Sequence, residues 1–332
     1  MAAVFGLAAA TNAAQADPTV ELGAKLYQDR CAACHEGGVP EAPRREAMAA
    51  LSPEAVRRAL TDGVMQAQAA GLGRTDIAFI SQYVAAGAVT AFDASKHSCP
   101  GKPGLDGATG WNRWGNGLDN RRFQPAAVSG LNAANVAGLE LKWAFGFPGA
   151  VRARSQPAIA GEMLFTGSQD GAVYALNAAT GCIWWTFEAE AEVRNAITVR
   201  HDDDGKPESL YFGDFAANVY RIDAATGRLR WRVDVSDHPA GTITGSVTLA
   251  GDQLFVPMSS TEVISAYDPA YNCCTFRGGV LALNADSGER QWRFYTVDEP
   301  RPQAKNSEGR QLYGPSGAPV WSTPTVDEAR GL

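Results

Sequence analysis

The chain has 332 residues, 45% of them hydrophobic and 20% charged, a balance that excludes a disordered protein and a protein embedded mainly in a membrane. Lys and Arg number 29 against 36 Asp and Glu, so the net charge of −7 speaks against nucleic acid as a partner. The 35 Gly, 18 Pro and 8 Trp indicate tight turns between aromatic-rich strands. Six Cys are too few for a disulfide scaffold, so each position needs its own explanation.

Residues 1–16 are small and mostly apolar and end in Ala14-Gln15-Ala16, which fits the cleavage site of a secretory signal peptide. No Lys or Arg precedes the apolar run, and the run is short, so a disordered Ala-rich N-terminus is the alternative. We expect an exported protein with a truncated signal and no integral membrane span. Disulfides can form in such a compartment.

Residues 17–91 are expected to form a small helical domain. Residues 23–30 and 75–86 have the patterns of helices, and Ser52-Pro53 is a strong start for another one. A Ser at the N-cap accepts a backbone N–H, and Pro at the first turn loses no helical hydrogen bond. The pattern therefore predicts a short all-α domain before the aromatic-rich part of the chain.

Cys31, Cys34 and His35 form a C-x-x-C-H pattern, which is the signature of covalent haem attachment. Each thiol can form a thioether with one vinyl group of the haem, and the adjacent His supplies the proximal nitrogen to iron. A zinc half-site and a thioredoxin-like redox pair are the alternatives. Neither a second C-x-x-C at zinc spacing nor a βαβ pattern accompanies this one.

A thioether from Met is the expected sixth ligand of the iron. Met65 lies in a loop ahead of the last helix, Met48 lies where packing against the ring edge is more natural, and His97 falls in the linker. We expect Met65 to be the ligand, with core filler as the alternative role for a lone Met. Over residues 18–90 the domain resembles the class I cytochrome c family, and the position of Met65 follows that resemblance.

Residues 92–110 are rich in Gly, Pro, Ser and Asp and predict an interdomain linker. Beyond it, an Asn/Asp-Ala-x-Thr/Ser-Gly segment is followed four residues later by Trp in three copies, at Trp185, Trp231 and Trp292. A degenerate copy ends at Trp143. The intervals from Trp143 to Trp185 and from Trp185 to Trp231 are 42 and 46 residues. A period in the forties indicates a β-propeller.

Each copy has an alternating strand, a turn and the start of the next strand. We expect the Trp to pack between adjacent blades, so that Gly and Trp are scaffold without chemistry. Residues 111–332 supply about four blades at this period. The blade motif resembles that of the pyrroloquinoline quinone dehydrogenases, whose closed propeller has about eight blades, so the chain is expected to hold the N-terminal part of a truncated propeller.

The blade motif, together with residues 114–123, resembles the pyrroloquinoline quinone (PQQ) dehydrogenases. A cytochrome c domain ahead of the propeller is similar to the order in the polyvinyl alcohol dehydrogenases. The resemblance implies a periplasmic quinohaemoprotein that uses PQQ, Ca²⁺ and haem c. It implies oxidation of polyvinyl alcohol or related secondary alcohols to ketones, with electrons passed to a soluble cytochrome or a respiratory-chain acceptor.

Two other functions stay open. A dehydrogenase for small alcohols or sugars would share the cofactors, and a non-catalytic assembly or binding propeller fused to an electron-transfer cytochrome would share the blades. The haem motif at Cys31 and the adjacent pair Cys273 and Cys274 argue against the second.

The resemblance also implies site residues. Cys273 and Cys274 would form a disulfide against one face of PQQ, with two unrelated thiols as the alternative, and Trp321 would lie beneath the other face. Glu262 would bind Ca²⁺. The other PQQ contacts implied are Arg194, Thr242, Thr244 and Ser259.

The remaining two cysteines, Cys99 and Cys182, are expected to form a disulfide that ties the linker to the first blades. The catalytic base of the family is an Asp downstream of the Trp that corresponds to Trp321, and we expect it beyond residue 332. No catalytic residue is therefore assigned from the sequence.

Overall fold

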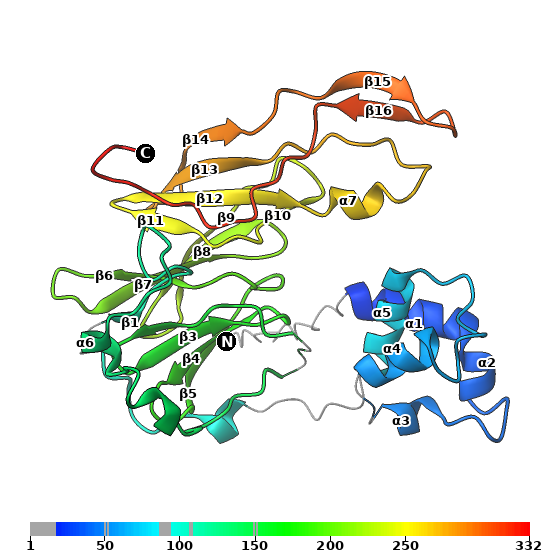
Figure 1. Cartoon of the computed structure of the whole chain (residues 1–332), viewed down its shortest axis with the longest axis horizontal. Helices are drawn as coiled ribbons and strands as arrows, with labels where there is room; N and C mark the ends of the chain where they lie inside the picture. Colours follow the sequence, from blue (N-terminus) through cyan, green and yellow to red (C-terminus); the bar gives the residue numbers. More distant parts are fainter. Residues whose placement is uncertain are drawn as a thin grey trace, which may run out of the picture. The chain divides into compact units, whose positions relative to one another are not determined.

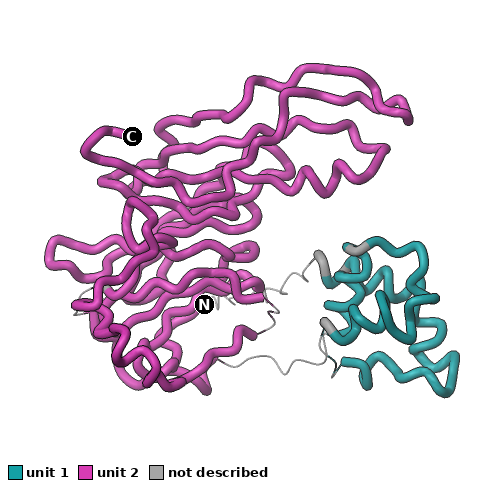
Figure 2. Tube along the Cα trace, in the orientation of Figure 1, with its two compact units in different colours: residues 1–92 teal, residues 93–332 magenta. Residues whose placement is uncertain are grey.

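The computed structural model describes residues 18–49, 51, 53–85, 94–105, 109–148, 150 and 152–332. The chain divides into two compact units, Met1–Phe92 and Asp93–Leu332 (Figure 2). The expected signal peptide at residues 1–16 and the helix-starting Ser52 lie outside the described residues. No helix in the described part of the chain is long and apolar enough to span a bilayer.

The first unit is helical, as the sequence predicts. Its core consists of side chains from helices and loops, including Tyr27, Val56, Leu60 and Ile80, all of which are buried. The Tyr27 and Tyr83 rings lie 5.3 Å apart and join the first helix to the last. The helices are α1 (Pro18–Arg30), α2 (Ala32–His35), α3 (Arg45–Met48), α4 (Pro53–Thr61) and α5 (Arg74–Ala85).

The second unit contains successive antiparallel sheets (Figure 1). The first sheet has the order β1-β2-β3-β4-β5, and its strands are β1 (Thr109–Trp111), β2 (Ala158–Ala160), β3 (Met163–Gly167), β4 (Ala172–Asn177) and β5 (Ile183–Glu188). The second has the order β6-β7-β8-β9, with β6 (Thr198–His201), β7 (Pro207–Gly213), β8 (Asn218–Asp223) and β9 (Leu229–Asp234).

The third sheet has the order β12-β13-β14, and both β10 and β11 pair with β12. Its strands are β10 (Gly241–Thr242), β11 (Thr248–Ala250), β12 (Gln253–Ser260), β13 (Gly279–Asn284) and β14 (Arg290–Tyr295). A hairpin of β15 (Arg301–Lys305) and β16 (Gln311–Gly314) follows. The short helices are η1 (Ala94–His97), α6 (Ala126–Ser129), η2 (Val136–Gly138) and α7 (Glu262–Ser265).

Two hydrophobic clusters of the second unit lie between consecutive sheets. One combines side chains of the first and second sheets, such as Phe165 and Phe212, and another combines the second and third, such as Val219 and Leu283. All four of these residues are fully buried. Burying apolar area between sheets is what holds successive blades together, at about 25 cal/mol per Å².

The repeated turn is held by its own side chain. Asn177 Oδ1 accepts the backbone N–H of Thr180 at 2.9 Å, and the Gly that ends the turn has a positive φ. An Asn or Asp with a hydroxyl residue three positions on closes such a turn, and Gly adopts the left-handed conformation at no steric cost. The corresponding Asp223–Thr226 and Asn284–Ser287 bonds measure 3.0 and 2.9 Å.

Three Trp residues, Trp143, Trp185 and Trp231, pack on the turn of the following blade, as the sequence predicts, whereas Trp292 of the last copy is 42% exposed. Trp185 Nε1 donates to the carbonyl of Ala224 at 3.1 Å, and a Cβ added to Gly227 would lie 2.6 Å from the same indole. The other two such pairs are Trp143 with Ala178 and Gly181, and Trp231 with Ala285 and Gly288. The Gly is therefore required both by the turn and by the neighbouring indole.

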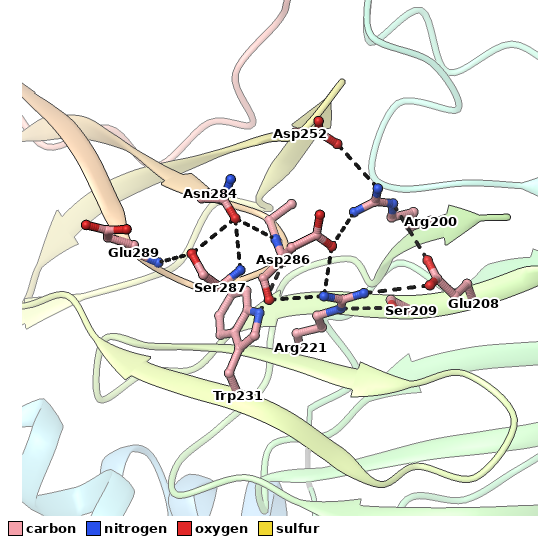
Figure 3. A network of polar contacts seen from close by, with 11 residues as sticks. Arg200, Glu208, Ser209, Arg221, Trp231, Asp252, Asn284, Asp286, Ser287 and Glu289 are labelled. Atoms are coloured by element: carbon pink, nitrogen blue, oxygen red, sulfur yellow. Dashed lines mark hydrogen bonds and ion pairs between the residues drawn. The ribbon is translucent and has the colours of Figure 1, made fainter.

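Two arginines of the second sheet reach the same turn of the third (Figure 3). Asp286 Oδ1 lies 2.8 Å from Arg200 and 2.9 Å from Arg221, and Arg200 also pairs with Asp252 at 3.3 Å. Glu208 lies 3.7 Å from Arg200. These ion pairs are partly exposed, so each contributes little to stability. They lie at the interface between the second and third sheets, where Trp231 also packs.

The structure places part of the expected linker against the first sheet. Cys99 and Cys182 form the expected disulfide, with 5.1 Å between their Cα atoms. The Cys99 amide donates to the Ile183 carbonyl at 2.9 Å, and Ser98 forms a bridge with Ile183. The disulfide ties this segment to the first sheet, as the sequence analysis expects from the two cysteines.

Where the sequence predicts about four blades, the described residues form three large sheets and the two-stranded sheet β15-β16. Between residues 112 and 157 the described part of the chain forms α6 and η2 and no strand. The degenerate copy that ends at Trp143 therefore makes no sheet of its own. It supplies only the Trp that packs on the first sheet.

Gly227→Ala should destabilise the second unit more than Gly205→Ala. Both glycines have positive φ (69° and 78°), but a Cβ at Gly205 meets nothing within 4 Å. The left-handed conformation alone costs about 1–2 kcal/mol, and the clash with Trp185 adds about 1–3 kcal/mol. Urea unfolding measures both losses, and equal losses would contradict the Trp–Gly account.

Candidate functional site

The haem-attachment residues lie around the end of α1 and in α2. Cys31 is half-buried, Cys34 is exposed, and neither thiol forms a disulfide. Burial raises the pKa of the Cys31 thiol, and the nearby Arg30 offsets part of that rise. Both thiols are therefore free to form thioethers, as a haem at this site requires.

His35 is held in one orientation. Its side chain is buried, and Nδ1 lies 2.7 Å from the backbone carbonyl of Pro43. A hydrogen bond from Nδ1–H to a carbonyl leaves Nε2 as the unprotonated nitrogen, which is the tautomer that binds iron. The donor set of this unit fits a covalently bound haem.

The structure places both candidate sixth ligands on the same hydrophobic cluster. Met65 follows α4, is half-buried, and donates its backbone N–H to Ala59 at 2.9 Å. Met48 ends α3 and is also half-buried against that cluster. His97 lies in the second unit, in η1.

A pocket of about 330 Å³ in the second unit brings together three of the residues expected to bind PQQ. Arg194 precedes β6, Thr244 lies between β10 and β11, and Trp321 follows β16. Trp321 is 72% exposed, so its ring is open to a ligand. The full lining is Trp114, Asn120, Arg194, Asn195, Thr244, Gly245, Ser246, Trp321, Ser322, Thr323 and Thr325.

Arg194 presents a cation to this pocket. Its Nε donates to Glu192 at 3.2 Å, and its guanidinium lies 4.8 Å from the centre of the Phe215 ring. Its two terminal nitrogens have no hydrogen bond to any residue that the structure describes. An Arg held by Nε and by an aromatic face keeps its forked end for an acidic ligand.

Thr242 and Thr244 have buried hydroxyl oxygens without a hydrogen-bond partner among the described residues. An unsatisfied buried hydroxyl costs about 1–3 kcal/mol, so such atoms indicate a missing ligand or water. Thr242 pairs in register with Ser259 of β12, and both side chains are buried. Thr244 lines the pocket, whereas Thr242 and Ser259 lie on the adjacent strands.

Cys273 and Cys274 form the expected disulfide with each other. Their segment pairs with the one that leads to Trp321: the Cys273 carbonyl accepts from Tyr313 at 2.6 Å, and Phe276 accepts from Gly317 at 2.7 Å. The disulfide and the exposed indole therefore belong to two hydrogen-bonded segments.

Glu262 begins α7 and has a buried carboxylate. Oε1 accepts the Thr275 amide at 2.8 Å and the Tyr271 hydroxyl at 3.1 Å, and Oε2 accepts the Phe276 amide at 3.0 Å. His238 Nε2 lies 3.5 Å from Oε1. The Tyr271 hydroxyl and the two backbone amides thus donate three hydrogen bonds to the carboxylate.

Several polar residues of the pocket were missed by the sequence analysis. Asn120 donates from Nδ2 to the Thr323 carbonyl at 3.2 Å and to Thr325 Oγ1 at 3.0 Å. These bonds join residues 114–123, the opening segment of the propeller, to the segment that follows Trp321. Ser246 Oγ accepts the Ala196 amide at 2.8 Å. Isolated Asn, Ser and Thr carry no sequence signal of their own, although Asn120 lies within the opening motif.

The family model described as "Glucose/ethanol/alcohol dehydrogenase, beta-propeller domain" matches residues 111–332. A second model, "Cytochrome C oxidase, cbb3-type, subunit III", matches residues 18–84. The chain belongs to the PQQ-dependent quinohaemoprotein alcohol dehydrogenase family. Its family membership and its order of domains are those expected from the sequence.

Two curated relatives match almost the whole chain. A polyvinylalcohol dehydrogenase from Pseudomonas sp. is 38% identical over 99% of this chain and 54% of the relative. The polyvinylalcohol dehydrogenase from Sphingopyxis sp. is 37% identical over 97% of this chain and 52% of the relative. The chain therefore spans about half the length of these relatives.

Among solved structures, the quinohemoprotein alcohol dehydrogenase ADHIIG from Pseudomonas putida matches with a TM-score of 0.47 and 24% identity. That match covers 60% of this chain and 28% of the other one.

The residues present fit PQQ and haem c. The free end of Arg194 and the unpartnered hydroxyl of Thr244 suit an acidic, oxygen-rich ring system. By contrast, the described residues contain no group of three or more His, Cys, Asp and Glu side chains that could hold a metal.

Replacing Met65 by Ala should lower the reduction potential of the haem by on the order of 0.1 V, since loss of a thioether ligand removes the group that raises it. Met48→Ala is the matched control, because Met48 packs on the same cluster. Redox titration of the haem-loaded protein measures both. A lower potential in Met48→Ala, with an unchanged potential in Met65→Ala, would identify Met48 as the sixth ligand of the iron.

Proposed function

We propose that this chain belongs to an exported, periplasmic dehydrogenase that oxidises secondary alcohol groups, those of polyvinyl alcohol or a similar molecule, to ketones. Electrons would pass to haem c at Cys31, Cys34 and His35, and then to a soluble cytochrome or a respiratory-chain acceptor. The pocket that joins Arg194, Thr244 and Trp321 carries the proposal. The names of the two relatives support the choice of substrate.

PQQ, when bound, supplies a quinone that takes up two electrons. The chain's own residues would hold PQQ in place. Arg194 would pair with a carboxylate of the ligand, and the Thr244 hydroxyl would donate a hydrogen bond to it. The Trp321 indole would stack against the planar ring. Thr242 and Ser259 lie one strand pair away, and their buried hydroxyls can complete the polar wall.

The described residues that line the pocket include no carboxylate. The group that takes the proton of the substrate hydroxyl therefore lies outside this lining, and we assign no catalytic base. We likewise route no step through Ca²⁺. In the haem unit, the carbonyl of Pro43 fixes the His35 tautomer, so that Nε2 stays available to iron.

Reduced-minus-oxidised haem spectra test the proposal directly. Addition of PQQ and then of polyvinyl alcohol to the oxidised, haem-loaded protein should reduce the haem, and polymer without PQQ should not. Reduction by small primary alcohols or sugars but not by secondary alcohols would favour the alternative substrate class. If no alcohol gives PQQ-dependent reduction, the proposed function is wrong.

Arg194→Gln should raise the Kd for PQQ by roughly 10- to 100-fold, the usual effect of losing a charge-assisted pair. Arg154→Gln is the matched control, because Arg154 also faces Glu192, at 4.0 Å, but is 41% exposed and outside the pocket lining. Quenching of Trp fluorescence by PQQ measures both affinities. Equal Kd values for the two variants would remove Arg194 from the site.

A further inference from the structure

Glu262 and His238 lie next to each other, and both contact Thr275, the residue that follows the vicinal disulfide. Glu262 accepts the backbone N–H groups of Thr275 and Phe276, at 2.8 and 3.0 Å. The same carboxylate also accepts the Tyr271 hydroxyl, which precedes the disulfide. One buried carboxylate thus holds the chain on both sides of the cysteine pair.

His238 holds the side chain of Thr275. The Ala240 amide donates to Nδ1 at 3.1 Å, so the ring proton is on Nε2. Nε2 lies 3.0 Å from Thr275 Oγ1 and 3.5 Å from Glu262 Oε1. The His238 ring also packs edge-on against Phe276 at 5.7 Å.

The position of His238 is itself fixed. Its backbone N–H donates to Ser236 Oγ at 3.2 Å, and its carbonyl accepts from that hydroxyl at 2.6 Å and from the Gly241 amide at 2.8 Å. The Thr261 amide donates to the Ala240 carbonyl at 2.9 Å, which joins this loop to the start of α7. A rigid support therefore stands behind the ring that contacts Thr275.

We propose that His238 and Glu262 are positioning residues that clamp the Cys273–Cys274 loop. We call these two residues the loop clamp. The loop is hydrogen-bonded on its other side to the segment that ends at Trp321, through Tyr313 and Gly317. The clamp thereby fixes the disulfide relative to the exposed indole. That the clamp helps to bind the cofactor rests on the proposed function, whereas the existence of the clamp rests only on the contacts above.

The test compares two variants of Thr275. Thr275→Val keeps the shape of the side chain and loses the hydroxyl, whereas Thr275→Ser keeps the hydroxyl. His238→Phe keeps a ring against Phe276 and loses both ring nitrogens. Reduction of each disulfide by a water-soluble phosphine is followed by alkylation and peptide mass spectrometry. Cys99–Cys182 on the first sheet is the internal control.

We expect Cys273–Cys274 to be reduced about 3- to 10-fold faster in Thr275→Val and His238→Phe, the factor given by loss of one ordinary hydrogen bond. Thr275→Ser should match the wild type, and Cys99–Cys182 should be reduced at one rate in all variants. Unchanged reduction of Cys273–Cys274, or equal acceleration of both disulfides, would overturn the clamp.

The Kd for PQQ separates the clamp from the proposed function. We expect Thr275→Val and His238→Phe to bind PQQ several-fold more weakly than Thr275→Ser. If the wild type binds no PQQ while the disulfide rates follow the expected order, the clamp stands and the proposed function fails. If PQQ binds equally to all variants, the clamp does not position the cofactor site.

Discussion

The contact between an indole ring and a glycine of the next blade is the constraint on which the second unit depends. A Cβ at any of the three turn glycines would lie 3.0 Å or less from the indole. The indole N–H also bonds to a carbonyl of the same turn, at 3.1 Å in each of the three cases. Ring and turn thus fix each other in distance and in orientation, and the apolar clusters between sheets follow from that spacing.

The pocket is a consequence of this arrangement. Its lining comes from segments far apart in the sequence: Arg194 and Asn195, Thr244 to Ser246, Trp321 to Thr325, and the opening segment at Trp114 and Asn120. No local interaction brings these segments together. Asn120 joins the opening segment to the last one by side-chain bonds to Thr323 and Thr325. The site exists only because the sheets hold their order.

The scaffold could be predicted from the sequence because its determinants are local. The side chain of Asn177 closes its own turn, and Trp185 meets the same kind of turn one period later, so the spacing alone indicates the contact. The haem motif is local for the same reason: Cys31, Cys34 and His35 are close in sequence because they bind one ring. Trp143 has the repeat's contact without strands of its own, which its sequence alone could not show.

The determinants of the candidate site are not local in the sequence. Arg194, Thr244 and Trp321 could be named only by resemblance to a family, because nothing in their own neighbourhoods brings them together. His238 was missed for that reason, since a lone His in a loop gives no signal until Thr275 and Glu262 lie beside it. The hydrogen bonds that Glu262 accepts from the Thr275 and Phe276 amides were missed for the same reason.

A crystal structure of this chain with PQQ tests the central claim most directly, which is that the sheets assemble a cofactor site from these distant segments. The account predicts a planar ligand over the Trp321 indole, with a carboxylate at the free end of Arg194 and the Thr244 hydroxyl within hydrogen-bond distance. A quinone bound elsewhere, with Arg194 and Thr244 uncontacted, would contradict it.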